Sequence, residues 1–143
     1  WNTYRGGEVP PRLAIEMDRA IAGVEAAVAG RGEAAASAAI DVAQSTLDLE
    51  LRHRPPVEID QARFELWARQ LEVDAAATDL DAVSGDLATL EWVRDRFAHT
   101  VEEAGLTQVD SHLNTLRDSV VDEDLAAVGE EAAGLRETVA GLG

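Results

Sequence analysis

The sequence predicts an all-α protein, a helical bundle. Of its 143 residues, 46% are hydrophobic but only 4% are aromatic, and alanine, the best helix former, supplies much of the apolar content. The four prolines come as two pairs that divide the chain between periodic segments. Large aliphatic residues recur every seven positions through the middle of the chain, the spacing that keeps one side of a helix against a partner helix. We expect one domain, residues 1–143.

Two helices are expected before the centre of the chain, after an extended lead-in over residues 1–9. Pro10-Pro11 opens the first helix, because a proline in the first turn sacrifices no hydrogen bond, and Gly30-Arg31-Gly32 is expected to end it. The second helix is expected from about Glu33 to Arg52, before Pro55-Pro56. The apolar stripe of the first helix has spacings of three and four and consists of Leu13, Met17, Ile21, Val24 and Val28.

The segment from Val57 to Ala104 carries the seven-residue repeat and is expected to form the centre of the fold. Its phase passes through Gly85 without a slip, so we expect one long central helix, roughly 70 Å at 1.5 Å per residue. The alternative is a turn at Ser84-Gly85-Asp86, because glycine destabilises a helix interior by about 1 kcal/mol. The repeat runs through Ile59, Leu66, Val73, Leu80, Leu87, Arg94 and Val101.

Two further helices are expected after the central segment. Gly105 is expected to end that segment as a C-terminal glycine cap, and Thr107 with Asp110 resembles a capping box for the next helix. Asp122-Glu123-Asp124 is expected to cap a last helix that runs from Leu125 to about Gly141. The prediction is therefore a long central helix flanked by helical hairpins, about five helices in all, or six if the centre breaks near Gly85.

The charge of the chain restricts its chemistry and its partners. The formal net charge is −16, all 12 basic residues are arginine, and there is no cysteine. Without lysine or cysteine, the chain cannot form a Schiff base, a Walker-type phosphate site or a thiolate site. An acidic surface repels nucleic acids and anionic membranes. We therefore expect cations or a basic protein as partners, with plain solvation of the acidic faces as the alternative.

Export is the expected location. The chain starts at Trp1 instead of methionine, which suggests either a removed upstream signal or trimming of the sequence. No stretch approaches the roughly 20 apolar residues that span a bilayer. We therefore expect an extracytoplasmic protein.

The histidines are the first candidates for a metal site. If Gly105 sits at a tight hairpin, His99 and His112 come level on adjacent helices. Asp95 lies four residues before His99, on the same helix face. Two imidazoles and a carboxylate suit a divalent metal ion. The alternative is that both histidines are partly exposed polar residues beside an apolar seam.

Glu50 and His53 form a second, weaker candidate. Their E-x-x-H spacing occurs in ferritin-like di-iron bundles, but such sites need a second motif and two further glutamates. His53 is better explained as a polar group near a helix C-terminus.

No nucleophile, phosphate loop or redox signature stands out among these residues. The sequence thus predicts a non-catalytic binding or interaction protein, an accessory domain of an exported or envelope process. We expect it to need no cofactor and to have no enzymatic activity. The alternative is a bundle that binds a metal or another cation, and the sequence leaves the oligomeric state open.

Overall fold

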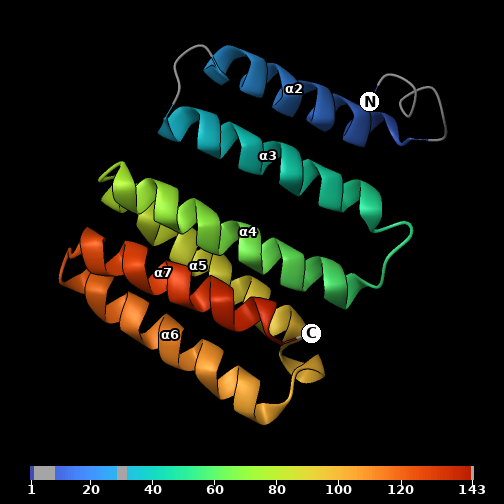
Figure 1. Cartoon of the computed structure of the whole chain (residues 1–143). Coiled ribbons are helices and arrows are strands. Elements are labelled where there is room, and N and C mark those ends of the chain that lie inside the picture. The colour runs from blue at the N-terminus through green and yellow to red at the C-terminus, as the bar shows by residue number, and fades with distance from the viewer. Residues whose placement is uncertain (2–8, 29–31, 143) are drawn as a thin grey trace. The chain divides into compact units, whose positions relative to one another are not determined.

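The structure is a computed structural model, and it describes residues 1, 9–28 and 32–142. All regular structure in these residues is helical, which confirms the predicted all-α bundle (Figure 1). There are six α-helices and one short 3-10 helix among them: α2 (Pro11–Val28), α3 (Glu33–Glu50), α4 (Pro56–Ala76), α5 (Leu80–Phe97), η1 (Ala98–Thr100), α6 (Glu103–Val121) and α7 (Leu125–Ala140).

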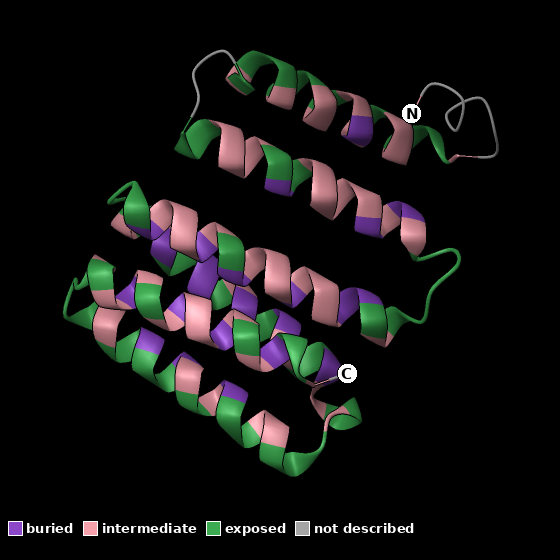
Figure 2. Ribbon diagram, viewed as in Figure 1, coloured by how far each residue is buried: buried purple, intermediate pink, exposed green. Residues whose placement is uncertain are grey.

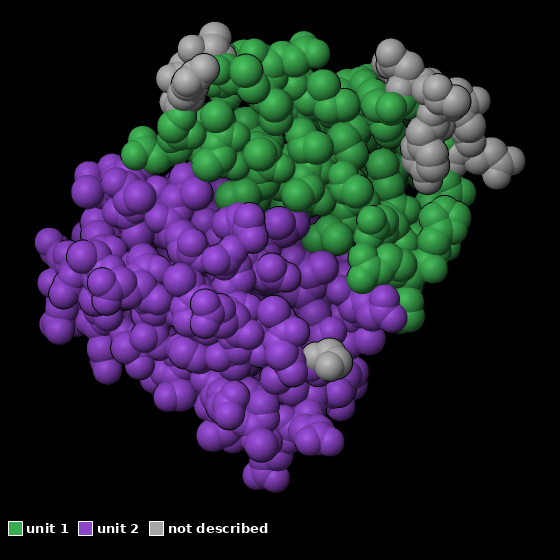
Figure 3. Space-filling model, in the orientation of Figure 1, with its two compact units in different colours: residues 1–55 green, residues 56–143 purple. Residues whose placement is uncertain are grey.

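The chain divides into two compact units, Trp1–Pro55 and Pro56–Gly143, coloured separately in Figure 3. We call them unit 1 and unit 2. Each has its own internal packing, so each is described by itself. The expectation of a single domain over the whole chain stays a prediction.

Unit 1 is a hairpin of α2 and α3. The first predicted helix is confirmed with its start at Pro11, and Met17 on its apolar stripe is buried. Helix α3 starts at Glu33 as predicted and ends at Glu50, two residues earlier than expected. Of the glycines expected to end the first helix, Gly30 lies outside the described residues, as does most of the lead-in.

Unit 2 is a four-helix bundle in which successive helices run in opposite directions (Figure 1). Helix α4 packs against α5 and α7, and α6 packs against α7 and, less extensively, α5. The helices bury one continuous apolar cluster between them, which Figure 2 shows as the purple stripes on their inner faces. Phe64 of α4 and Phe97 of α5 meet edge to face there, with ring centroids 5.4 Å apart, a favoured aromatic geometry.

The expected long central helix is wrong, because the chain reverses between α4 and α5. The break falls at residues 77–79, and Gly85 lies inside α5. Thr78 adopts a left-handed conformation with φ 59°, and the amide of Asp79 donates to the Asp74 carbonyl at 3.0 Å. This is the Schellman pattern that ends helices. Asp79 then starts α5, because its carboxylate accepts from the Ala82 amide at 3.0 Å.

The turn between α6 and α7 is built in the same way. Glu123 has φ 56°, and the amide of Asp124 donates to the Ser119 carbonyl at 2.9 Å. The Asp124 side chain then caps α7 by accepting from the Ala127 amide at 3.0 Å. The predicted cap at the start of the last helix is therefore confirmed.

The start of α6 corrects two further expectations. Gly105 lies inside the first turns of α6, which begins at Glu103, so it is not a helix cap. Thr107 is also inside α6, where its hydroxyl donates to the Glu103 carbonyl, so it forms no capping box with Asp110. A Cβ at Gly105 would come within 2.5 Å of the Leu142 side chain. The glycine thus allows the C-terminal end of the chain to pack closely on α6.

Candidate functional site

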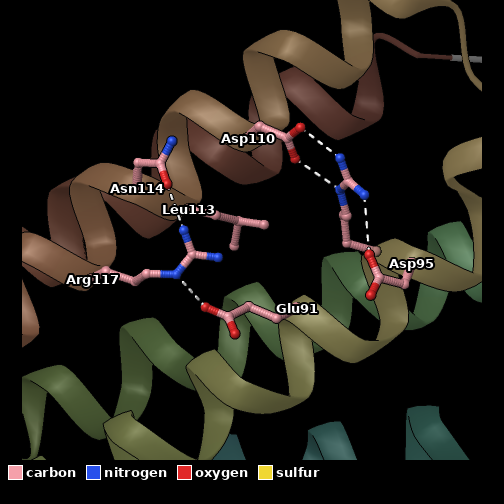
Figure 4. Close-up of a pocket in the computed structure, with 7 residues that line it drawn as sticks. Glu91, Asp95, Asp110, Leu113, Asn114 and Arg117 are labelled. Atoms are coloured by element: carbon pink, nitrogen blue, oxygen red, sulfur yellow. Dashed lines mark hydrogen bonds and ion pairs between the residues drawn. The ribbon is translucent and has the colours of Figure 1, made fainter.

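A polar cavity of unit 2 lies between α5 and α6 (Figure 4). We call it the α5–α6 cleft. Its volume is about 350 Å³, and one side is formed by the last turns of α5 while the other is formed by the middle of α6. The cleft is lined by Glu91, Arg94, Asp95, Asp110, Leu113, Asn114 and Arg117.

Arg94 joins the two helices across this cleft. Its Nε donates to Asp110 Oδ1 at 2.7 Å and its Nη2 donates to Asp110 Oδ2 at 2.5 Å, while Nη1 donates to Asp95 at 3.0 Å. The paired, planar contact with Asp110 is the geometry in which arginine binds carboxylates most strongly. The hydrogen bonds that Arg94 donates to Asp110 are the main cause that raises the pKa of Arg94 above its ordinary value. The arginine in the seven-residue repeat therefore has the partner that a partly buried charge needs.

Arg117 makes the second bridge of the α5–α6 cleft. Its Nε donates to Glu91 at 2.5 Å, and its Nη1 donates to the side-chain oxygen of Asn114. Both arginines of the cleft are thus occupied by the protein's own carboxylates. The lining residues offer carboxylates, guanidinium groups, one amide and one leucine. This set can recognise charge and hold two helices together, and it contains no hydroxyl, thiol or imidazole that could attack a substrate.

The three residues predicted to bind a metal have different surroundings and partners in the structure. His99 is exposed in η1, beyond the end of α5. The Asp95 side chain is 75% exposed and pairs with Arg94. His112 has its own partners on α7. Within the described ranges, no group of three or more His, Cys, Asp or Glu side chains could hold a metal ion. Metal binding by His99, His112 and Asp95 stays a prediction.

His112 links α6 to α7 through both ring nitrogens. Nδ1 lies 2.6 Å from a carboxylate oxygen of Glu131, and Nε2 lies 2.9 Å from the hydroxyl of Thr138. Gly134 lies opposite the ring, where an added Cβ would approach Cε1 to 3.4 Å, so the glycine leaves space for the imidazole.

The order hydroxyl, imidazole, carboxylate in this group is that of a catalytic triad. However, Thr138 lies inside α7, where the backbone amides are used in helical hydrogen bonds. The backbone amides beside Thr138 therefore cannot stabilise an oxyanion. The group is better explained as a polar clamp between two helices.

The weaker metal candidates lie in unit 1. Glu50 is the last residue of α3 and pairs with Arg54 at 2.6 Å, while His53 is exposed in the turn that follows. Both residues line the rim of a largely apolar cavity of about 440 Å³ in the hairpin. Its other lining residues are Trp1, Met17, Ile21, Val42, Thr46 and Leu49. Metal binding by Glu50 and His53 also stays a prediction.

Sequence reasoning missed the partners in these groups. The position of Arg94 in an apolar repeat signals that it needs a carboxylate, but not that Asp110 supplies it. For the histidine clamp, the available signal is that Glu131 and Thr138 are seven residues apart and therefore share one face of α7. Nothing in the sequence signals which facing residue joins them.

Comparisons of the chain with protein-family models, with curated proteins and with solved structures find no match. A search of the described helices for one long and apolar enough to cross a membrane also finds none.

Proposed function

We propose that this chain is a non-catalytic binding module and that unit 2 binds a basic segment of a protein partner. The observation that carries the proposal is the uneven distribution of charge. Residues 56–143 contain 20 of the 28 acidic residues but only six of the 12 arginines. Residues 1–55 contain eight acidic residues and six arginines, so their charges nearly balance. The negative charge that would attract a cationic partner is thus concentrated in unit 2.

Within unit 2, exposed carboxylates gather at one end of the bundle. The α4–α5 turn and the α6–α7 turn lie at that same end, to the left in Figure 1. Six exposed acidic residues lie in or beside these turns, and we call them the acidic end: Asp79, Asp81, Asp118, Asp122, Glu123 and Asp124. Val121 lies among them with 79% of its surface exposed. An apolar contact surrounded by carboxylates suits a basic segment that also carries an aliphatic side chain.

Four of the six arginines of unit 2 pair with carboxylates away from the acidic end. Arg94 and Arg117 are occupied in the α5–α6 cleft, Arg96 pairs with Asp60, and Arg136 pairs with Glu72. The carboxylates in these pairs all lie outside the acidic end. A cationic partner would therefore meet like charges that none of these four arginines neutralises, and binding it would relieve their mutual repulsion.

Binding of a short polylysine peptide to the full chain tests this proposal. We expect binding that weakens steeply as salt rises, because the screening length falls to about 8 Å at physiological ionic strength. The variant Asp118→Asn/Asp122→Asn/Glu123→Gln removes three charges and leaves both capping aspartates in place. At about 0.5–1 kcal/mol for each charge contact, we expect it to bind at least about tenfold more weakly.

A matched control removes the same charge from unit 1. The variant Glu25→Gln/Glu33→Gln/Asp41→Asn changes three exposed residues of α2 and α3, and we expect the affinity to stay near that of the natural sequence. Equal weakening by both variants would mean that only net charge matters and would refute a site at the acidic end. Absence of binding to the natural sequence at low salt would refute the proposal as a whole.

A further inference from the structure

Two carboxyl groups meet at the packed face between α4 and α5. Asp86 of α5 is only 7% exposed, and the carboxyl group of Asp74 on α4 lies within hydrogen-bonding reach of it. The Oδ2 oxygen of Asp86 is buried and has no hydrogen-bond partner among the described residues. Such a pair differs from the exposed carboxylates of the acidic end, because water cannot screen the charge of Asp86.

The neighbours of the two carboxyl groups indicate that Asp86 carries the proton. The amide nitrogen of Gln70 lies 3.0 Å from each carboxylate oxygen of Asp74 and donates to them. A carboxylate that accepts from an amide nitrogen is stabilised in its ionised form. Asp86 has no such donor, and a carboxyl–carboxyl hydrogen bond needs one proton. The geometry therefore favours a protonated Asp86.

The charged groups that act most strongly on Asp86 are all acidic. They are Asp74 on α4 and Asp79 in the preceding turn, and no group from α6 or α7 is among them. Burial, followed by the hydrogen bond and charge of Asp74, raises the pKa of Asp86 to about 8. Among the residues described, no metal-binding group of three ligands includes the pair.

We propose that Asp74 and Asp86 share one proton at neutral pH and that loss of this proton in mildly alkaline solution loosens the packing of α4 against α5. The pair is thus a pH-sensitive latch inside unit 2. When the proton leaves, two facing carboxylates repel each other in a site that excludes water. This inference is independent of the binding partner proposed for the acidic end.

The sign of the pH dependence follows from linkage. The folded-state pKa of Asp86, about 8, lies above the ordinary value of 3.8 for an unfolded chain. Between these values the folded protein holds a proton that the unfolded chain has lost, so stability falls as pH rises. The contribution is fully present below the ordinary pKa and is lost once pH has risen through about 8.

Thermal or urea unfolding from about pH 5 to about pH 9 tests the latch through the variant Asp86→Asn. The asparagine amide can donate to Asp74 and cannot lose a proton in this range. We expect the natural sequence to lose stability with rising pH and Asp86→Asn to lack that loss. Glu130→Gln is the matched control, because it removes one exposed charge on α7 and should keep the pH dependence. A variant Asp86→Asn with the same pH profile as the natural sequence would overturn the proposal.

Carbon-13 NMR of the aspartate carboxyl groups provides a second measurement that does not depend on Asp86→Asn folding. In the natural sequence we expect one aspartate to titrate at about pH 8, and in Asp74→Asn we expect that titration to move to lower pH, because the neighbouring negative charge is gone. If every aspartate of the natural sequence titrates in the acidic range, the pair holds no proton at neutral pH and the latch does not exist.

Discussion

Replacing Gly85 with alanine tests where the chain reverses between α4 and α5. Gly85 lies inside α5, and an added Cβ would have no atom within 4 Å. Alanine stabilises an exposed helix interior relative to glycine by about 0.5–1 kcal/mol, because glycine loses more backbone freedom on folding. Since no clash opposes this gain, we expect the full amount in Gly85→Ala. It corresponds to a rise in melting temperature of about 3 °C for a domain of this size.

Urea unfolding followed by tryptophan fluorescence is a suitable assay. Trp67 and Trp92 belong to unit 2, so the signal reports mainly on the bundle that contains Gly85. Gly23, an exposed helical glycine of α2 that also has nothing within 4 Å, supplies the matched control Gly23→Ala in unit 1. If residue 85 stood in a turn with positive φ, alanine would be strained there and would lower the stability of unit 2. A destabilised Gly85→Ala would therefore refute the assignment of the break to residues 77–79.

Two further substitutions test the packing and the turn of unit 2. Phe97→Ala removes a fully buried ring from contact with Phe64. We expect it to lower the free energy of unfolding, measured by urea, by about 3–5 kcal/mol, and a loss below about 1 kcal/mol would contradict the packing. Thr78→Gly relieves a β-branched residue at φ 59°, and we expect a gain of about 0.5–1 kcal/mol in the same assay, whereas a loss would show that Thr78 is not in the left-handed region.

The helices themselves could be predicted because their apolar spacing and their proline pairs are local signals. The break in the central segment could not, because Thr78 is not the glycine that usually marks a left-handed helix end. The seven-residue repeat also continues across the turn: Val73 and Leu80 keep its phase although they belong to different helices. A repeat in the sequence records which residues are apolar and does not require that one helix carries them all.

The repeat also does not predict which face of α4 is buried. The repeat predicts Leu66 and Val73 as the seam, yet both are only partly buried. The fully enclosed stripe of α4 within unit 2 consists of Phe64, Ala68, Leu71 and Ala75. Both stripes are visible in the sequence, since the helix is apolar on two sides. Which stripe enters the bundle depends on the neighbouring helices, and that information is not local.

Long-range pairing explains why the functional groups were harder to predict than the helices. Arg94 and Asp110 are on different helices, as are His112 and its partners, so no sequence spacing joins them. Asp86 lies one residue before Leu87 of the repeat, just as Glu58 lies one residue before Ile59. Glu58 is nevertheless exposed, whereas Asp86 is buried. Only the contact between α4 and α5 distinguishes a buried carboxyl from a solvated one.

Two carboxylates of the acidic end oppose the stability of α6, which bears on the proposed function. Asp79 and Asp124 cap the N-termini of α5 and α7, where the helix dipole favours a negative charge. Asp118 and Asp122 instead lie in the last turn and at the C-cap of α6, where the dipole disfavours it, and α6 has no basic residue in that turn.

Each of these two carboxylates costs about 0.3–1 kcal/mol at low salt, so the variant Asp118→Asn/Asp122→Asn/Glu123→Gln should unfold at higher urea than the natural sequence even as it loses affinity for a basic peptide. Binding that falls while stability rises cannot come from partial unfolding. It would indicate that these carboxylates act on a partner at the expense of the fold. A variant that lost both stability and affinity for the peptide would show that they serve the bundle alone.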